Sequence, residues 1–147
     1  MKELINGPLA EYNQLYKEMD EIYHLYAKKH GVSDTALWLM YSLYLNDAEN
    51  TQSEICSAWH YPPQTINSAL KRMEKQGLIL LDAVPGNQKN KLIKLSEKGR
   101  EMIEKAIAPL VEAEQKAFQG LKPKEKAALF ALTRKYTQLL RSQMDKI

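Results

Sequence analysis

The sequence predicts a mainly α-helical fold with one small β-hairpin in its second half. Three observations predict it. Apolar residues recur at helical spacing through most of the chain, two short β-rich runs lie close together between residues 78 and 95, and turn or capping residues separate the segments. Hydrophobic residues make up 44% of the 147 residues and charged residues 27%, a balance that favours one packed domain over a disordered chain.

The first part of the chain predicts two long helices. Residues 8–30 carry two overlapping apolar and tyrosine stripes, which cover more than the arc of a helix lying on a single domain. This helix therefore needs partners on more than one side. Gly31 ends it in the usual place for a left-handed cap. Ser33 can cap the next helix, over residues 34–46, which is rich in leucine and aromatic residues.

Two shorter helices joined by a tight turn should follow. In "TQSE", residues 51–54, threonine and glutamate have the spacing of a capping box, which predicts a helix over residues 52–59. Pro62 and Pro63 prevent this helix from continuing. Pro63 suits the first turn of a new helix, over residues 63–76, because its missing N–H does no harm there.

The next segment predicts the hairpin, and two long helices complete the chain. "LILLDAV" and "KLIKL" are strand-like, and "PGNQKN", residues 85–90, should form an exposed tip between them. Ser96 can cap a long helix that Pro109 should kink, and Pro123 begins the last helix. A helix-turn-helix followed directly by a hairpin is a winged helix-turn-helix.

The helix over residues 63–76 has two chemically different faces. One is an apolar seam that should be buried, and it comprises Ile66, Ala69, Leu70 and Met73. The opposite pole holds amides, hydroxyls and cations and no carboxylate. On this helix alone, a solvated face that happens to lack acids explains the pattern equally well. The preceding turn and the following hairpin favour a DNA-binding arrangement.

Each exposed residue type on this helix has a use in a DNA groove. Gln and Asn pair with adenine, Arg pairs with guanine, and Ser or Thr reach base edges or phosphates. The residues expected to read bases are Gln64, Thr65, Asn67 and Ser68. The residues expected to hold the phosphate backbone are Lys71, Arg72 and Lys75 from the helix, with Asn87, Gln88, Lys89, Asn90 and Lys91 from the hairpin.

Charge is distributed unevenly along the chain. Residues 1–50 carry 4 basic and 8 acidic side chains, residues 51–95 carry 6 and 3, and residues 96–147 carry 11 and 7. A polyanion would therefore be drawn to the middle and end of the chain. The total charge of +3 is too small by itself to argue for nucleic acid.

The chain resembles the multiple-antibiotic-resistance regulator (MarR) family. The residues that carry the likeness are "TQSEICSAWHYPPQTINSALKRMEKQGLI" and "KLIKLSEKG". The family's recognition helix ends in Leu-Glu-x-x-Gly-Leu-Ile, here "MEKQGLI", and its last strand closes with Leu-Thr-x-x-Gly, here "LSEKG". The terminal helices match the family's dimerisation region, so the resemblance covers essentially the whole chain.

The resemblance implies a homodimeric bacterial transcriptional regulator, usually a repressor, that binds a pseudo-palindromic operator. Residues 1–147 would form one MarR-type domain, with a DNA-binding lobe at 33–99 and dimerisation helices at 1–32 and 100–147. One compact winged lobe cannot cover those helices, whereas a second copy can. Many members are released from DNA by a small aromatic or phenolic ligand.

Four residues are candidates for lining such a ligand crevice: Tyr23, His24, Trp38 and Tyr41. An aromatic stripe at helical spacing belongs more often to a core or a dimer interface. Both interpretations therefore remain open for these residues.

Two positions depart from the family pattern. Pro62 stands where the family usually has a Ser-like cap, and because proline has no side-chain acceptor, a cap worth on the order of 1 kcal/mol is missing. Gln88 stands where the family has an Arg that enters the minor groove. A neutral side chain loses the attraction of a narrow groove for a cation, so DNA binding should be weaker or different in sequence preference.

Other function classes find less support. No phosphate loop, Gly-x-Ser-x-Gly elbow or His-Glu-x-x-His occurs, so neither an enzyme nor a cofactor is expected. The three histidines lack metal-ligand spacing, and Cys56 is most simply a packed residue. The most apolar run, residues 36–45, is shorter than the roughly 20 residues that cross a bilayer, so a cytoplasmic protein without a membrane partner is expected.

The alternative function is a winged helix that docks proteins, with weak or no specific DNA binding. A protein-docking helix would more often expose Leu, Phe or Tyr at its pole. This helix exposes Gln, Ser and Lys there, which favours DNA.

Overall fold

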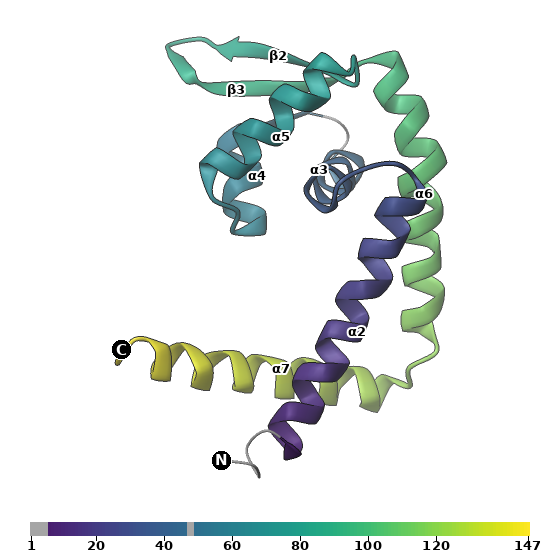
Figure 1. Ribbon diagram of the computed structural model, residues 1–147, viewed down its shortest axis with the longest axis vertical. Coiled ribbons are helices and arrows are strands. Elements are labelled where there is room, and N and C mark those ends of the chain that lie inside the picture. The colour runs from purple at the N-terminus through teal and green to yellow at the C-terminus, as the bar shows by residue number, and fades with distance from the viewer. Residues whose placement is uncertain (1–5, 47–48) are drawn as a thin grey trace. The chain divides into compact units, whose positions relative to one another are not determined.

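The computed structural model of the protein describes residues 6–46 and 49–147. The chain divides into two compact units, Met1–Pro109 and Leu110–Ile147, and α6 crosses the boundary between them. Among the described residues, no helix is both long and apolar enough to span a membrane. In chain order the elements are α2 (Pro8–Lys29), α3 (Asp34–Leu45), β1 (Glu49–Thr51), α4 (Gln52–Trp59), α5 (Pro63–Lys75), β2 (Ile79–Val84), β3 (Asn87–Leu95), α6 (Glu97–Gln119) and α7 (Pro123–Met144) (Figure 1).

Local capping chemistry sets most helix boundaries, as the sequence predicts. Gly31 adopts a left-handed φ of 71° after α2. The Ser33 hydroxyl accepts a hydrogen bond from the Ala36 N–H at 3.1 Å, which caps α3. The Thr51 hydroxyl accepts from the Glu54 N–H at 3.3 Å, which caps α4. The helix-turn-helix and the long flanking helices are therefore confirmed.

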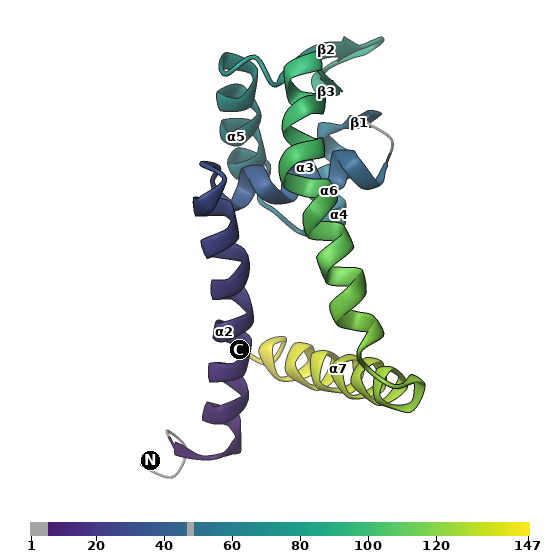
Figure 2. The ribbon, with the colours of Figure 1, turned by 90° about the vertical axis from the view of Figure 1, so that its right-hand side faces the viewer.

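The sheet differs from the predicted hairpin in two ways. β3 begins at Asn87, so the predicted six-residue tip over 85–90 is wrong and only Pro85 and Gly86 connect the strands. Gly86 has φ of +80°, which lets the chain reverse within two residues. The sheet also gains β1, which pairs antiparallel with β3 and gives the strand order β1-β3-β2 (Figure 2). A strand of three residues has too little alternation to be predicted from its own sequence.

The core of the first unit lies where α3, α5 and the inner face of the sheet meet. All four residues of the predicted apolar seam of α5 are buried. They pack among the other fully buried large side chains, which are Leu37, Leu39, Met40, Leu43, Ile55, Ile79, Ile93 and Ile107. This packing fixes the opposite face of α5 toward solvent.

The second unit consists of the end of α6 and all of α7. Phe118 stacks on Phe130 with ring centroids 5.8 Å apart, and the Lys126 ammonium lies 5.5 Å from the Phe118 centroid. The Lys122 N–H donates to the Glu125 carboxylate at 2.7 Å, which caps α7. No residue of α7 is buried within the chain, although the helix is 22 residues long.

Candidate nucleic-acid interface

The exposed face of α5 collects the residues that the sequence predicts to contact DNA. Seven predicted contacts are exposed there: Gln64, Thr65, Asn67, Ser68, Lys71, Arg72 and Lys75. Within the described part of the chain, none of the ion pairs takes up a cation of this helix. These three positive charges are therefore available to an external anion.

The start of α5 is shaped by its two prolines. Pro63 is the first helical residue, and Pro62 occupies the N-cap position without a side-chain hydrogen bond, as predicted. The Pro62 carbonyl accepts from the Thr65 and Ile66 N–H groups, at 3.0 and 3.3 Å. The first turn of α5 is thus tied to the backbone of the turn before it.

Arg72 lies on a different flank of α5 from Lys71. It lines a cavity of about 450 Å³ that lies between α5, the turn after α2 and the beginning of α6. Lys98 lines the same cavity, and its ammonium donates to the Gln76 carbonyl at the end of α5, at 2.9 Å. A cation at a helix C-terminus is favourable because of the helix dipole. Sequence reasoning missed Lys98, because only the fold brings it to this end of α5.

The hairpin residues predicted to contact DNA fall into three groups. Asn87 is exposed, and its side-chain oxygen accepts from the Asn90 N–H at 3.3 Å. The Asn90 side-chain oxygen accepts from the Ser53 N–H at 3.2 Å, which joins β3 to the first turn of α4. Lys91 is half-buried, and the side chains of Gln88 and Lys89 lie outside the described part of the structure. Asn90 therefore holds the hairpin against the helix-turn-helix.

The structure brings three of the four predicted ligand-crevice residues to one cavity of about 370 Å³. Tyr23, His24 and Trp38 line this cavity. Tyr41 is not among its lining residues but packs against Trp38, with ring centroids 5.5 Å apart. The cavity is also lined by residues that sequence reasoning did not select: Lys17, Asp20, Glu21, Asp34, Leu37 and Tyr61. We call it the α2–α3 cavity.

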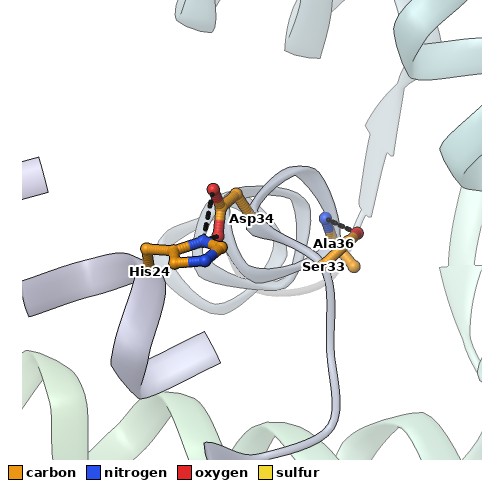
Figure 3. A network of polar contacts seen from close by, with 4 residues as sticks. All are labelled: His24, Ser33, Asp34 and Ala36. Carbon is orange, nitrogen blue, oxygen red and sulfur yellow. Dashed lines mark hydrogen bonds and ion pairs between the residues drawn. The ribbon is translucent and has the colours of Figure 1, made fainter. Parts of the chain in front are cut away.

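A hydrogen-bonded histidine–aspartate pair joins the two helices that form the α2–α3 cavity. His24 Nδ1 on α2 lies 3.0 Å from Asp34 Oδ1 at the start of α3 (Figure 3). Both side chains are more than half exposed, at 60% and 55%. Asp34 also acts on Tyr61, since burial, and then the negative charge of Asp34, raise the pKa of that phenol.

An aromatic cluster connects this cavity to the turn between α4 and α5. Trp38 lies 4.9 Å from Tyr23 and 5.3 Å from Trp59, measured between ring centroids. Trp59 is the last residue of α4 and also packs against Tyr41 in a T-shaped contact, with ring centroids 5.9 Å apart. Sequence reasoning did not select Trp59, because its neighbours in the cluster come from other helices.

Cys56 lies on α4 and is half-buried. Burial raises the pKa of its thiol, with an opposing, smaller effect from a backbone hydrogen bond. A raised pKa disfavours the reactive thiolate. The structure therefore agrees with a packed cysteine.

Comparison with known proteins places the winged-helix region in a family. Residues 30–86 match the profile of the MarR family. This region belongs to the MarR family. A search of curated proteins found no match.

Solved structures extend the likeness to the MarR fold over most of the chain. The DNA complex of S. aureus MepR is 20% identical and aligns over 89% of this chain and 96% of its own, with a TM-score of 0.72. NMB1585, a MarR family regulator from Neisseria meningitidis, is 21% identical over 95% of this chain and 98% of its own, with a TM-score of 0.75. The organohalide-sensing regulator RdhR-CbdbA1625, in its 2,4-dichlorophenol-bound form, is 19% identical. It aligns over 88% of this chain and 77% of its own, with a TM-score of 0.68. The chain thus has the fold of MarR-family transcription regulators.

Proposed function

We propose that this chain is a sequence-specific DNA-binding repressor that acts as a homodimer on a pseudo-palindromic operator and responds to a small molecule. The observation that carries the proposal is the exposed face of α5, where amides, hydroxyls and cations lie opposite a buried apolar seam. A surface of this composition suits the major groove, where amides recognise bases and cations meet phosphates. The similarity to a regulator solved with DNA supports the same function.

The two halves of α5 have different roles in the proposed DNA binding. Gln64, Thr65, Asn67 and Ser68 form the first half of the helix and read base edges. Lys71, Arg72 and Lys75 form the second half and hold phosphates. The hairpin adds backbone contacts through residues 87–91, with Asn90 fixing its position against α4. Such a division is expected when a helix enters a groove by its N-terminal end.

The terminal helices support the homodimer. α2 and α7 expose large apolar side chains along their length, including Ile22 at 67% and Leu132 at 66%. A helix without burial is marginal in water, and apolar surface of this extent marks an interaction site. A second copy offers the same apolar surfaces in return, as a two-fold axis requires. We assign residues 1–32 and 100–147 to dimerisation and residues 33–99 to DNA binding.

Response to a small molecule is supported by the α2–α3 cavity. This cavity lies between a helix assigned to dimerisation and the DNA-binding lobe, so its occupant touches both. Binding there can change how the lobe is held and thereby lower the affinity for the operator. The regulator solved with 2,4-dichlorophenol shows that a protein of this fold can hold an aromatic molecule.

Selection of bound fragments from random DNA tests the proposal. At low salt we expect enrichment of one pseudo-palindromic sequence whose half-sites are about one helical turn apart. Lys135→Ala, on the exposed surface of α7, serves as a control and should enrich the same sequence. Recovery of fragments without any shared palindrome would contradict specific operator binding. That outcome would favour the protein-docking winged helix.

A further inference from the structure

The α2–α3 cavity carries an excess of negative charge. Asp20, Glu21 and Asp34 line it, against two basic side chains, Lys17 and His24, of which His24 contacts Asp34 at 3.0 Å. The acidic side chains thus outnumber the basic ones by three to two. All of these residues belong to the first unit, so a single chain forms the cavity. A ligand with a negative charge would meet unfavourable Coulomb energy from these carboxylates, and a ligand with a positive charge would gain from them.

The walls of the same cavity are aromatic. Tyr23, Trp38 and Tyr61 line it, and Trp38 is held in place by its contacts with Tyr23, Tyr41 and Trp59. The face of an aromatic ring carries partial negative charge and attracts cations, most strongly in tryptophan. Carboxylates and ring faces therefore favour the same sign of charge in the ligand.

The spacing of the acidic side chains around the cavity favours an organic cation over a metal ion. Within residues 6–46 and 49–147, no three His, Cys, Asp or Glu side chains come together closely enough to hold a metal. The carboxylates are thus spread around the cavity, which suits a positive charge that is diffuse. A volume of about 370 Å³ lies within the range of sites for small organic molecules.

We propose that the α2–α3 cavity binds an organic cation, such as a quaternary ammonium group attached to an aromatic ring, through its aromatic walls and the carboxylates of Asp20, Glu21 and Asp34. This replaces the aromatic or phenolic effector implied by the family resemblance with one of positive charge. The inference rests on the proposed function in one respect, because it takes this cavity as the effector site.

The cavity is connected directly to the recognition helix. Tyr61 lines the cavity and precedes Pro62, whose carbonyl holds the first turn of α5. Trp59, two residues earlier, packs on Trp38. His60 between them has a left-handed φ of 55°, which is uncommon for a residue other than glycine. A ligand that moves Tyr61 or Trp38 therefore shifts the start of α5, and the occupied cavity lowers the affinity for DNA.

Tryptophan fluorescence gives a direct test, since the only two tryptophans of the sequence, Trp38 and Trp59, both belong to the cluster. The probes are benzyltrimethylammonium chloride and sodium benzoate, added to the full chain at equal ionic strength. We expect saturable quenching by benzyltrimethylammonium and none by benzoate. The proposal would be overturned if benzoate bound as tightly as the cation. It would also be overturned if the cation caused no saturable quenching of the tryptophan fluorescence.

Two double variants test whether the cation binds in the α2–α3 cavity. The double variant Asp20→Asn, Glu21→Gln removes two negative charges from the cavity and keeps the Ser33 cap and the His24–Asp34 pair. Its affinity for benzyltrimethylammonium should be about tenfold lower than that of the wild type. Glu101→Gln with Glu104→Gln, two exposed acids of α6, is the matched control and should leave the affinity unchanged. Equal affinity of the two double variants would overturn the assignment.

The fluorescence titration contains no DNA, so the two proposals can fail separately. Binding of the cation by a chain that selects no operator would refute the regulator and leave the cavity assignment standing. An operator bound equally well with and without saturating cation would refute the connection through Tyr61. Circular dichroism melting of each variant shows that a lost signal does not come from unfolding.

Discussion

Gly99 lies where the start of α6 closely approaches the segment that follows α5. A Cβ atom on Gly99 would collide with the carbonyl oxygen of Leu78. The same carbonyl accepts from the Ser96 N–H, at 3.0 Å, and the Ser96 hydroxyl donates to the Gly77 carbonyl. The start of α6 is thus hydrogen-bonded to the chain that leaves α5, and only glycine permits that close approach.

Gly99→Ala should destabilise the protein by roughly 1–3 kcal/mol, because the methyl group meets backbone that cannot move without breaking these bonds. The sign of the change in unfolding free energy is informative, because Gly→Ala in an open helix interior stabilises a protein by roughly 0.5–1 kcal/mol. The free energy of unfolding, measured in urea, checks the prediction. Glu104→Ala on the exposed face of α6 is the control, and a Gly99→Ala protein at least as stable as the wild type would contradict the close approach.

Substitutions at Lys71 and Asn67 distinguish the two roles proposed for α5, which are phosphate binding and base recognition. Lys71→Ala should weaken binding to every DNA sequence and reduce the slope of log affinity against log salt by about one unit, because one phosphate contact is lost. Asn67→Ala should instead relax the preference at one base step and leave that slope unchanged. Titrations of selected and scrambled DNA at several salt concentrations measure both effects. Equal losses on all sequences for both variants would show that these roles are misassigned.

At the scale of the element, the start of α5 shows how a missing cap is compensated. A serine at the N-cap would contribute on the order of 1 kcal/mol through its side-chain acceptor. Pro62 lacks that acceptor, but proline restricts the unfolded chain and so stabilises by about 0.4–1 kcal/mol where its φ fits. Its φ of −59° does fit. The two effects are similar in size, so Pro62 costs the helix little.

Two substitutions at Pro62 distinguish these contributions. Pro62→Ser gains the cap and loses the restriction, so its stability should stay close to that of the wild type. Pro62→Ala gains nothing, so it should be less stable than Pro62→Ser by about 1 kcal/mol. Thermal unfolding of the three proteins under one condition checks this order. If the alanine variant were as stable as the serine variant, the N-cap at position 62 would have no influence.

Elements that depend on local chemistry were predictable from the sequence, and those that depend on tertiary pairing were not. Ser33 and Pro63 mark helix starts through their own hydrogen bonding or fixed φ, so the sequence is enough to place them. β1 exists because β3 offers it a partner, and Asp34 lines the α2–α3 cavity because the turn after α2 brings it to His24. The charge of that cavity therefore became visible only once the helices were placed.

At the scale of the whole molecule, the exposed apolar side chains of the terminal helices are the basis of the proposed homodimer. The exposed large apolar residues of α2 are Leu9, Tyr12, Leu15, Tyr16, Met19, Ile22 and Leu25, and those of α7 include Leu129, Phe130, Leu132, Leu139, Leu140 and Met144. Each helix thus presents an apolar surface several turns long. A symmetric pair of chains also presents two α5 helices, which matches a palindromic operator.

A charge placed in these surfaces should separate the dimer. Ile22→Lys and Leu132→Lys each put an ammonium group where the partner would bury it, at a cost of several kcal/mol. Sedimentation equilibrium should give the mass of two chains for the wild type and of one chain for the combined variant. Glu18→Lys with Gln138→Lys adds the same side chains at exposed polar positions of the same helices and should remain dimeric.

Loss of the dimer should also lower operator affinity by 10²-fold or more, because each half-site is then bound without the effective concentration that the partner provides. The first unit should keep its fold in the separated chain, since α7 contributes no buried residue. Far-ultraviolet circular dichroism and the fluorescence of Trp38 and Trp59 measure that fold in the monomeric variant. A wild-type chain that is monomeric at micromolar concentration, or a combined variant that binds the full operator as tightly as the wild type, would show that α2 and α7 serve another partner.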